Sequence, residues 1–144
     1  MNQGHCHPKI LNTMIEQAKT LTLTSRAVYN NRLGPLEKKL HDIFGYDKAL
    51  LMNSGVEAGE SAVKIARRWG YATKNAQPDK ATVLFAKGNF WGRTIAACAS
   101  SDDPERYGDF GPFGGLNFDL IDYGDLNALE SALKNNPNIV AYMV

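Results

Sequence analysis

The sequence predicts an α/β fold built on a mainly parallel sheet, with helices on both faces. Three short apolar stretches are typical of buried strands, at residues 81–86, 118–122 and 139–144. Apolar residues at helical spacing lie before and between them, at residues 57–69 and 126–133. Strands that alternate with helices indicate a parallel sheet, because each parallel pair needs a crossover connection.

The N-terminal part of the chain is expected to form two helices and a strand. Pro8 suits the first turn of a helix with apolar residues at helical spacing. A Thr-rich connector at residues 21–25 follows. Pro35 is expected to open a second helix, and Gly45 to close it in a left-handed conformation. The apolar residues 48–52 predict a short buried strand.

Residues 57–69 predict a third helix, with Gly70 as its cap. The expected sheet-facing stripe contains small side chains that allow close approach; it consists of Ala58, Ala62, Ile65, Ala66 and Trp69. Glu60 and Lys64 are four residues apart, which predicts a surface ion pair. This helix therefore has one face assigned to the core and one to solvent.

Downstream of this helix, the strand at residues 81–86 is continuously apolar, as in sheets that are covered on both faces. A short helix is expected at residues 92–99. The loop at residues 101–117 is long, which indicates a functional or mobile segment. Asp125 is expected to cap the last helix, and the strand at residues 139–144 ends the chain.

Composition bounds the class of protein. The 144 residues are 44% hydrophobic and 22% charged, with a formal net charge of +1, so neither nucleic acid nor a membrane is an expected partner. Two cysteines, Cys6 and Cys98, make no disulfide framework and indicate a reducing compartment. We expect residues 1–144 to be a single partial domain with both ends truncated, because the last apolar strand stops without a turn residue.

The turn at residues 53–56 is the first candidate site. An apolar run stops at Asn53, and a helical pattern begins after Ser54 and Gly55. The first N–H groups of a helix have no partner within it and attract anions, most often phosphate. The turn lacks the Gly-Lys-Ser/Thr and Gly-x-Gly-x-x-Gly patterns, which disfavours nucleotides. An ordinary strand-to-helix turn is the alternative interpretation.

The second candidate site follows the next strand, at residues 88–94. Phe90 and Trp91 supply two aromatic rings, of which one is expected in the core. Arg93 has the planar donor fork that suits a carboxylate, although a solvated charge is the alternative. Ligands of open α/β sheets bind at the carboxyl ends of the strands. The two sites together predict a phosphorylated aromatic cofactor and an amino-acid substrate.

The segment His5-Cys6-His7 suggests a metal site, but no further ligand cluster completes a tetrahedron, so no metal is expected. No catalytic constellation of Ser, His and Asp, or of Cys and His, is identified from the sequence. The candidate chemistry is therefore that of the two turns.

Four segments resemble the class III pyridoxal-phosphate aminotransferases along essentially the whole chain: NQGHCHP at 2–8, LTLTSRA at 21–27, MNSGVEAGE at 52–60 and GNFWGRT at 88–94. FGPF at residues 110–113 is similar as well. The second and fourth segments favour the branch of the family that acts on ornithine over the acetylornithine and 4-aminobutyrate branches. The resemblance implies the large domain of a fold type I transferase.

The resemblance also implies the roles of the site residues. Gly55 and Val56 match the turn whose N–H groups hold the phosphate of pyridoxal 5'-phosphate, with Ser54 beside it. Phe90 matches the aromatic residue that stacks on the pyridine ring. Arg93 matches the arginine that binds the substrate carboxylate.

The implied reaction transfers the δ-amino group of L-ornithine to 2-oxoglutarate. The lysine that holds the cofactor and the carboxylate on the pyridine nitrogen match nothing here, so we assign no catalytic residue to this chain and expect it to be inactive alone. The family implies a homo-oligomer in the cytoplasm or the mitochondrial matrix.

Two alternatives stay open. One is a fragment of an enzyme for acetylornithine or another ω-amino acid. The other is a noncatalytic truncated copy that binds a full-length subunit.

Overall fold

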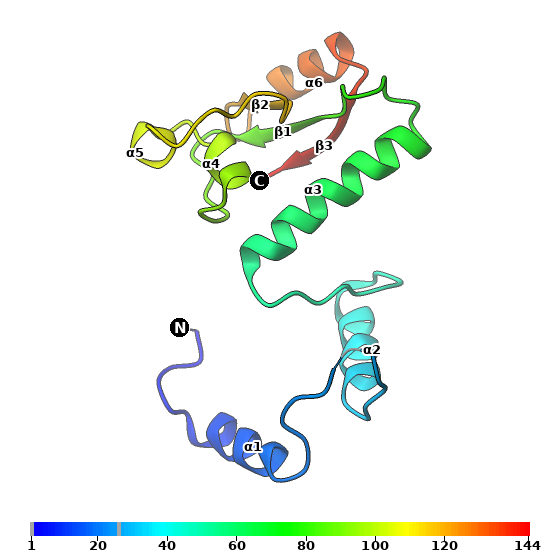
Figure 1. Ribbon diagram of the computed structural model, residues 1–144, viewed down its shortest axis with the longest axis vertical. Helices are drawn as coiled ribbons and strands as arrows, with labels where there is room; N and C mark the ends of the chain where they lie inside the picture. The colour runs from blue at the N-terminus through cyan, green and yellow to red at the C-terminus, as the bar shows by residue number, and fades with distance from the viewer. Residues whose placement is uncertain (1, 26) are drawn as a thin grey trace. The chain divides into compact units, whose positions relative to one another are not determined.

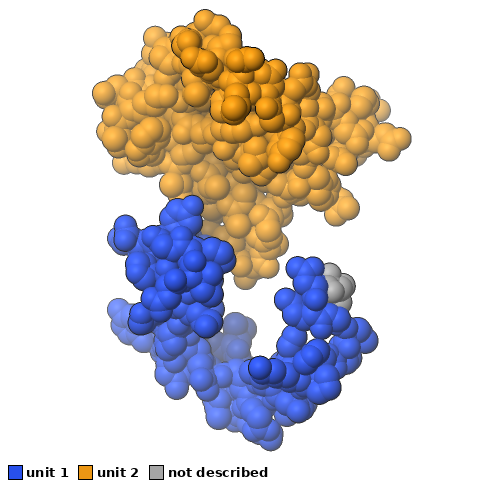
Figure 2. Space-filling view, turned by 180° about the vertical axis from the view of Figure 1, so that it is seen from behind, with its two compact units in different colours: residues 1–50 blue, residues 51–144 orange. Residues whose placement is uncertain are grey.

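The computed structural model describes residues 2–25 and 27–144, and it divides the chain into two compact units (Figure 2). Unit 1 is residues 1–50 and unit 2 is residues 51–144. Met1 and Arg26 lie outside the described residues, so the segment 21–27 is described only in part. Within the described chain, the helices lack the length and apolar character that crossing a membrane requires.

Unit 1 contains the two expected helices, α1 (Pro8–Ala18) and α2 (Leu33–Phe44). The Nδ1 atom of His7 accepts a hydrogen bond from the N–H of Lys9 at 3.3 Å and caps α1. Gly45 ends α2 with a φ of 76°, the left-handed conformation expected for it. α2 begins two residues before Pro35, because a proline is tolerated throughout the first turn of a helix.

The apolar side chains of unit 1 are exposed. None of its described residues is buried. The apolar side chains of both helices leave much of their surface in solvent: Ile15 is 43% exposed, Leu36 46% and Phe44 64%. Unit 1 therefore has amphipathic helices without a core of its own.

The strand predicted at residues 48–52 is wrong. These residues form no strand, and Leu50, Leu51 and Met52 are 64%, 47% and 40% exposed. An apolar extended run becomes a strand only when a neighbour satisfies its backbone groups, and the described chain places no strand beside it.

Unit 2 holds three strands and four helices, with at least one helix between successive strands (Figure 1). Its elements are α3 (Gly55–Ala72), β1 (Thr82–Ala86), α4 (Ile95–Ala99), α5 (Pro104–Tyr107), β2 (Phe118–Ile121), α6 (Leu126–Asn135) and β3 (Ile139–Met143). The three strands predicted in this unit are confirmed, and the short helix predicted at residues 92–99 is present but begins at Ile95. The predicted loop at 101–117 contains one unpredicted helical turn, α5, which Asp103 caps by accepting the N–H of Glu105 at 3.0 Å.

The sheet has the order β2-β1-β3 and both pairings are parallel, which confirms the predicted fold class. β1 is central and all five of its residues are buried. Val83 and Phe85 point to the face that packs against α3. Thr82 and Leu84 alternate to the other face and are also buried. Asn136, just after α6, donates to the Thr82 hydroxyl at 3.3 Å. Both faces of β1 are therefore covered.

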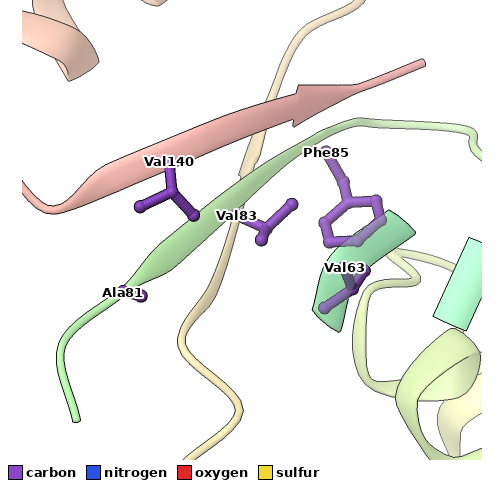
Figure 3. Packing of buried hydrophobic residues seen from close by; sticks show 5 residues of the cluster. All are labelled: Val63, Ala81, Val83, Phe85 and Val140. Carbon is purple, nitrogen blue, oxygen red and sulfur yellow. The ribbon is translucent and has the colours of Figure 1, made fainter. Parts of the chain in front are cut away.

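The face of α3 that packs on the sheet differs from the predicted stripe. Val63 joins Val83, Phe85 and Val140 in the core (Figure 3). Gly70 is buried within the helix rather than capping it, and a Cβ at that position would lie 2.2 Å from Cγ1 of Val140. Of the predicted stripe, Ala66 does pack against this core, whereas the other members are exposed: Ala58, Ala62, Ile65 and Trp69. The missing side chain of Gly70 permits the close packing that the apolar pattern does not reveal.

Candidate functional site

The N-terminus of α3 is built by Ser54. Its hydroxyl oxygen accepts the N–H of Glu57 at 3.3 Å, and its hydroxyl donates to the Glu57 carboxylate at 3.1 Å. The carbonyl of Ser54 accepts the N–H of Ala58 at 3.1 Å. In the described chain, the N–H groups of Gly55 and Val56 have no such partner. These two groups are therefore available to an anion at the positive end of the helix dipole.

Space for an anion exists beside Gly55. A Cβ built on Gly55 would meet no atom of the described residues within 4 Å. The backbone can therefore approach a ligand as closely as a phosphate cradle requires. The free N–H groups and the open space fit the phosphate of the expected cofactor.

Gly92 brings the second candidate segment against this turn. Its φ of 151° is unfavourable for residues with a side chain, and a Cβ there would lie 2.2 Å from Cγ2 of Val56. Gly59 plays the matching role one turn along α3, because its Cβ would lie 2.6 Å from Cε3 of Trp91. Two glycines thus let residues 91–92 pack directly on the first turns of α3.

Trp91 is the core aromatic residue and Phe90 is the exposed one, so the expectation of one core ring is confirmed. Trp91 stacks on Phe85 with ring centroids 5.7 Å apart and an interplanar angle of 8°. Its indole N–H donates to the buried hydroxyl of Ser100 at 2.8 Å. Phe90, by contrast, is 56% exposed and offers its ring to a ligand.

Two guanidinium groups accompany the Phe90 ring. The Cζ atom of Arg93 lies 5.4 Å from the ring centroid, and that of Arg106 lies 5.1 Å from it. Such distances are those of cation–π contacts. The sequence predicted Arg93 at this place. Arg106 was not predicted, because it comes from α5, a helical turn inside the expected loop.

A cavity of about 310 Å³ opens beside these groups. Phe90, Arg93 and Arg106 line it together with Cys98 and Phe110. Its described lining comes from residues 89–110 and leaves out Ser54, Gly55 and Val56. The rings of Phe90 and Phe110 therefore share one pocket with two guanidinium groups and the carboxylate of Glu105. The turn at residues 53–56 contacts the same segment through the packing of Val56 on Gly92.

The predicted surface ion pair of Glu60 is wrong. The Glu60 carboxylate accepts a hydrogen bond from the Thr94 hydroxyl at 2.5 Å, and no ion pair with Lys64 is found in the described chain. The Thr94 oxygen also accepts the N–H of Ala97 at 3.2 Å and so caps α4. Glu60 thus ties α3 to the start of α4, immediately after Arg93.

Lys87 and Asp122 form an ion pair at the carboxyl ends of β1 and β2, with Nζ and Oδ1 2.9 Å apart. The hydrogen bond to Asp122, followed by the charge of the same carboxylate, raises the pKa of Lys87 above its usual value. Elsewhere in residues 2–25 and 27–144, His, Cys, Asp and Glu side chains form no group of three that could hold a metal, and Cys6 and Cys98 are free.

The profile of the class-III aminotransferase family matches residues 1–141. The chain belongs to the class-III aminotransferases. Aminotransferases of this class are pyridoxal-phosphate enzymes that act on amino-acid and 2-oxo-acid substrates. The resemblance inferred from the four sequence segments is therefore confirmed.

Ornithine aminotransferases from several organisms are similar to the whole chain or nearly all of it. Rat mitochondrial ornithine aminotransferase is 56% identical over all 144 residues, which are 32% of its own length. A crystal structure of ornithine aminotransferase from Toxoplasma gondii superimposes with a TM-score of 0.92 and 52% identity, covering 97% of this chain and 33% of that one. Another crystal structure of the Toxoplasma enzyme has PLP at partial occupancy at the active site.

An acetylornithine aminotransferase from Elizabethkingia anophelis is also similar, with a TM-score of 0.76 and 46% identity over 98% of this chain and 33% of that one. These likenesses confirm the fold type I aminotransferase architecture for the described residues. The chain spans about a third of the length of the curated relatives it matches.

Proposed function

We propose that this chain is part of an ornithine aminotransferase, which uses pyridoxal 5'-phosphate to transfer the δ-amino group of L-ornithine to 2-oxoglutarate. The observation that carries the proposal is the packing of Gly92 on Val56, which unites an anion-binding helix end with an exposed aromatic ring and a guanidinium. The identity of 56% to the rat enzyme and 52% to the Toxoplasma enzyme supports ornithine as the donor.

Each site residue has one role in this proposal. The N–H groups of Gly55 and Val56 bind the cofactor phosphate, while Ser54 holds the helix end in place by its cap. Phe90 stacks on the pyridine ring, and Arg93 binds the substrate carboxylate. When bound, the cofactor supplies an electron sink for the reacting carbon. The chain itself binds and orients, and no catalytic residue is assigned to it.

We further propose that both units belong to one large domain of a homo-oligomeric enzyme located in the cytoplasm or the mitochondrial matrix. The printed names of the rat and Caenorhabditis elegans relatives place those proteins in mitochondria. Fractionation of cells, followed by size-exclusion chromatography of the complete protein, tests the location and the oligomeric state together.

Two substitutions in the complete enzyme test the roles. Phe90→Ala should weaken cofactor retention, measured by titration of the apoenzyme. Arg93→Ala should raise the KM for the amino acid by about 10-fold to 100-fold, because a charge-assisted hydrogen bond to the substrate contributes about 1.5–3 kcal/mol. Arg68→Ala, an exposed α3 arginine, is the control. Unchanged substrate kinetics in Arg93→Ala would refute the carboxylate assignment.

The likeness to the Elizabethkingia enzyme makes acetylornithine the second candidate donor. Comparing kcat/KM for ornithine and for acetylornithine in the complete enzyme decides between them. A truncated copy that binds a full-length subunit is the remaining alternative. Co-purification of the 144-residue chain with an intact subunit would support it, and failure to co-purify would count against it.

A further inference from the structure

The segment that carries Phe90 is tied to residues 100–106 by four hydrogen bonds. The contacts are Gly88 N–H to Asp102 Oδ1 at 2.9 Å, Asn89 Nδ2 to Ser100 O at 2.7 Å, Trp91 Nε1 to Ser100 Oγ at 2.8 Å and Arg106 Nη1 to Asn89 O at 2.9 Å. The first part of the expected loop is thus a support for the turn after β1. Phe90 lies within this support, yet its own ring is 56% exposed.

Arg106 is the one member of these four pairs that also contacts the Phe90 ring. Its Cζ lies 5.1 Å from the ring centroid while Nη1 donates to the neighbouring carbonyl of Asn89. Its Nε lies 3.0 Å from Oδ2 of Asp103, the cap of α5. The guanidinium is therefore held by two oxygen partners while its Cζ stays within cation–π distance of the ring.

We propose that Arg106 is a positioning residue that holds the ring of Phe90 at the cavity and acts on the cofactor only through that ring. The inference rests on the proposed function, which assigns Phe90 to the pyridine ring. A second carboxylate-binding arginine is the competing role. The structure disfavours it, because Asp103 balances the charge of Arg106 and Asn89 occupies another of its donors.

The test uses the complete apoenzyme and pyridoxal 5'-phosphate as the probe. Arg106→Gln should raise the Kd for the cofactor about two-fold to five-fold, the size of an exposed cation–π contact. It should also change the circular dichroism of the bound cofactor, which reports the orientation of the ring against its neighbours. The KM for the amino acid should stay within two-fold, and Arg106→Lys, which keeps the charge, should recover part of the loss.

A double-mutant cycle identifies the route of the effect. If Arg106 acts through Phe90, Arg106→Gln has no further effect on the cofactor Kd once Phe90→Ala is present. An equal effect in both backgrounds overturns the proposal, as does an unchanged Kd and dichroism in Arg106→Gln. A raised KM for the amino acid with unchanged cofactor Kd also overturns it, because Arg106 then contacts substrate.

Two further variants serve as the control for loss of an arginine and as a substitute for Arg106→Gln. Arg68→Gln, on the exposed side of α3, is the matched control for loss of an arginine. Should Arg106→Gln fail to fold, Asp103→Asn keeps a capping oxygen for α5 but removes the charged partner of Arg106, and it should move the Kd in the same direction. If Phe90→Ala itself leaves the Kd unchanged, the assignment of Phe90 in the proposed function fails. If Phe90→Ala raises the cofactor Kd but Arg106→Gln leaves it unchanged, the proposed function stands and the inference about Arg106 is wrong.

Discussion

Unit 1 and unit 2 both contain amphipathic helices, but the two units differ in how much of their apolar surface is buried. α1 and α2 of unit 1 bury none of their residues. β1 of unit 2 is buried along its whole length, with Phe85 and Val83 at 0% exposure. Amphipathic helices gain most of their stability from a face that is packed, so the described helices of unit 1 gain little stability from packing within unit 1. Unit 2, which carries all of the candidate site, has a core of its own.

The largest effect should come from deleting the central side chain of unit 2. Phe85→Ala is expected to lower the free energy of unfolding by about 3–5 kcal/mol, because the ring is fully buried between Trp91 and Phe118. Phe44→Ala in unit 1 removes a ring that is 64% exposed and should cost less than about 1 kcal/mol. Urea unfolding of residues 1–144, followed by circular dichroism, compares the two.

The same two substitutions also compare the two units in the complete enzyme. There, Phe44→Ala should become as costly as a core deletion if the rest of the protein covers unit 1. Equal costs for Phe44→Ala and Phe85→Ala within residues 1–144 would show that the contrast between the units is wrong.

The second-largest effect should come from the packing of Gly92 on Val56, where the two candidate segments of unit 2 meet. Gly92→Ala should lower the free energy of unfolding by about 2–4 kcal/mol, because its φ of 151° strains a side chain and the new methyl overlaps Val56. It should also weaken cofactor binding in the complete enzyme. Gly114→Ala is the control, since no described atom lies within 4 Å of a Cβ there. A wild-type cofactor Kd in Gly92→Ala would contradict the proposed role of this packing.

The sequence predicts most elements of unit 2 because local signals decide them. Ser54 and Asp125 each cap the helix that follows, and continuous apolar residues mark β1. The two turns of the site are predicted for the same reason. Gly45 ends α2 by the same local chemistry in unit 1.

The failures come from contacts between segments that are distant in the sequence. α3 packs through Gly59 and Gly70, which have no side chain for an apolar pattern to detect, against Trp91 and Val140. Leu50 lies in an apolar run without a paired strand. Arg106 joins the site through α5, whose single turn has too short a pattern to predict.

The third effect compares two helical glycines, one in each unit. Gly70→Ala should destabilise unit 2 by about 1–3 kcal/mol, because its methyl would lie 2.2 Å from Cγ1 of Val140. Gly34→Ala in α2 meets no described atom within 4 Å and should increase the helicity of unit 1, since alanine favours a helix by up to about 1 kcal/mol. Thermal unfolding of residues 1–144 measures both. A stabilising Gly70→Ala would mean that α3 does not pack closely on β3.

The smallest effect is electrostatic. The pKa of Lys87 is raised in the folded state by its hydrogen bond to Asp122, so the pair stabilises unit 2 fully below the usual lysine pKa and loses this contribution as the pH rises through the higher folded value. Lys87→Gln should therefore unfold at a lower urea concentration than the wild type at pH 8. The two midpoints should begin to converge above about pH 10.5 and meet once the pH exceeds the raised folded pKa of Lys87. Lys19→Gln removes an exposed ion pair with Glu16, three residues earlier in unit 1. It should leave the urea midpoint of unit 2 unchanged. If the urea midpoints of wild type and Lys87→Gln still differ above the folded pKa of Lys87, the stabilisation comes from the packing of its methylene groups rather than from its charge.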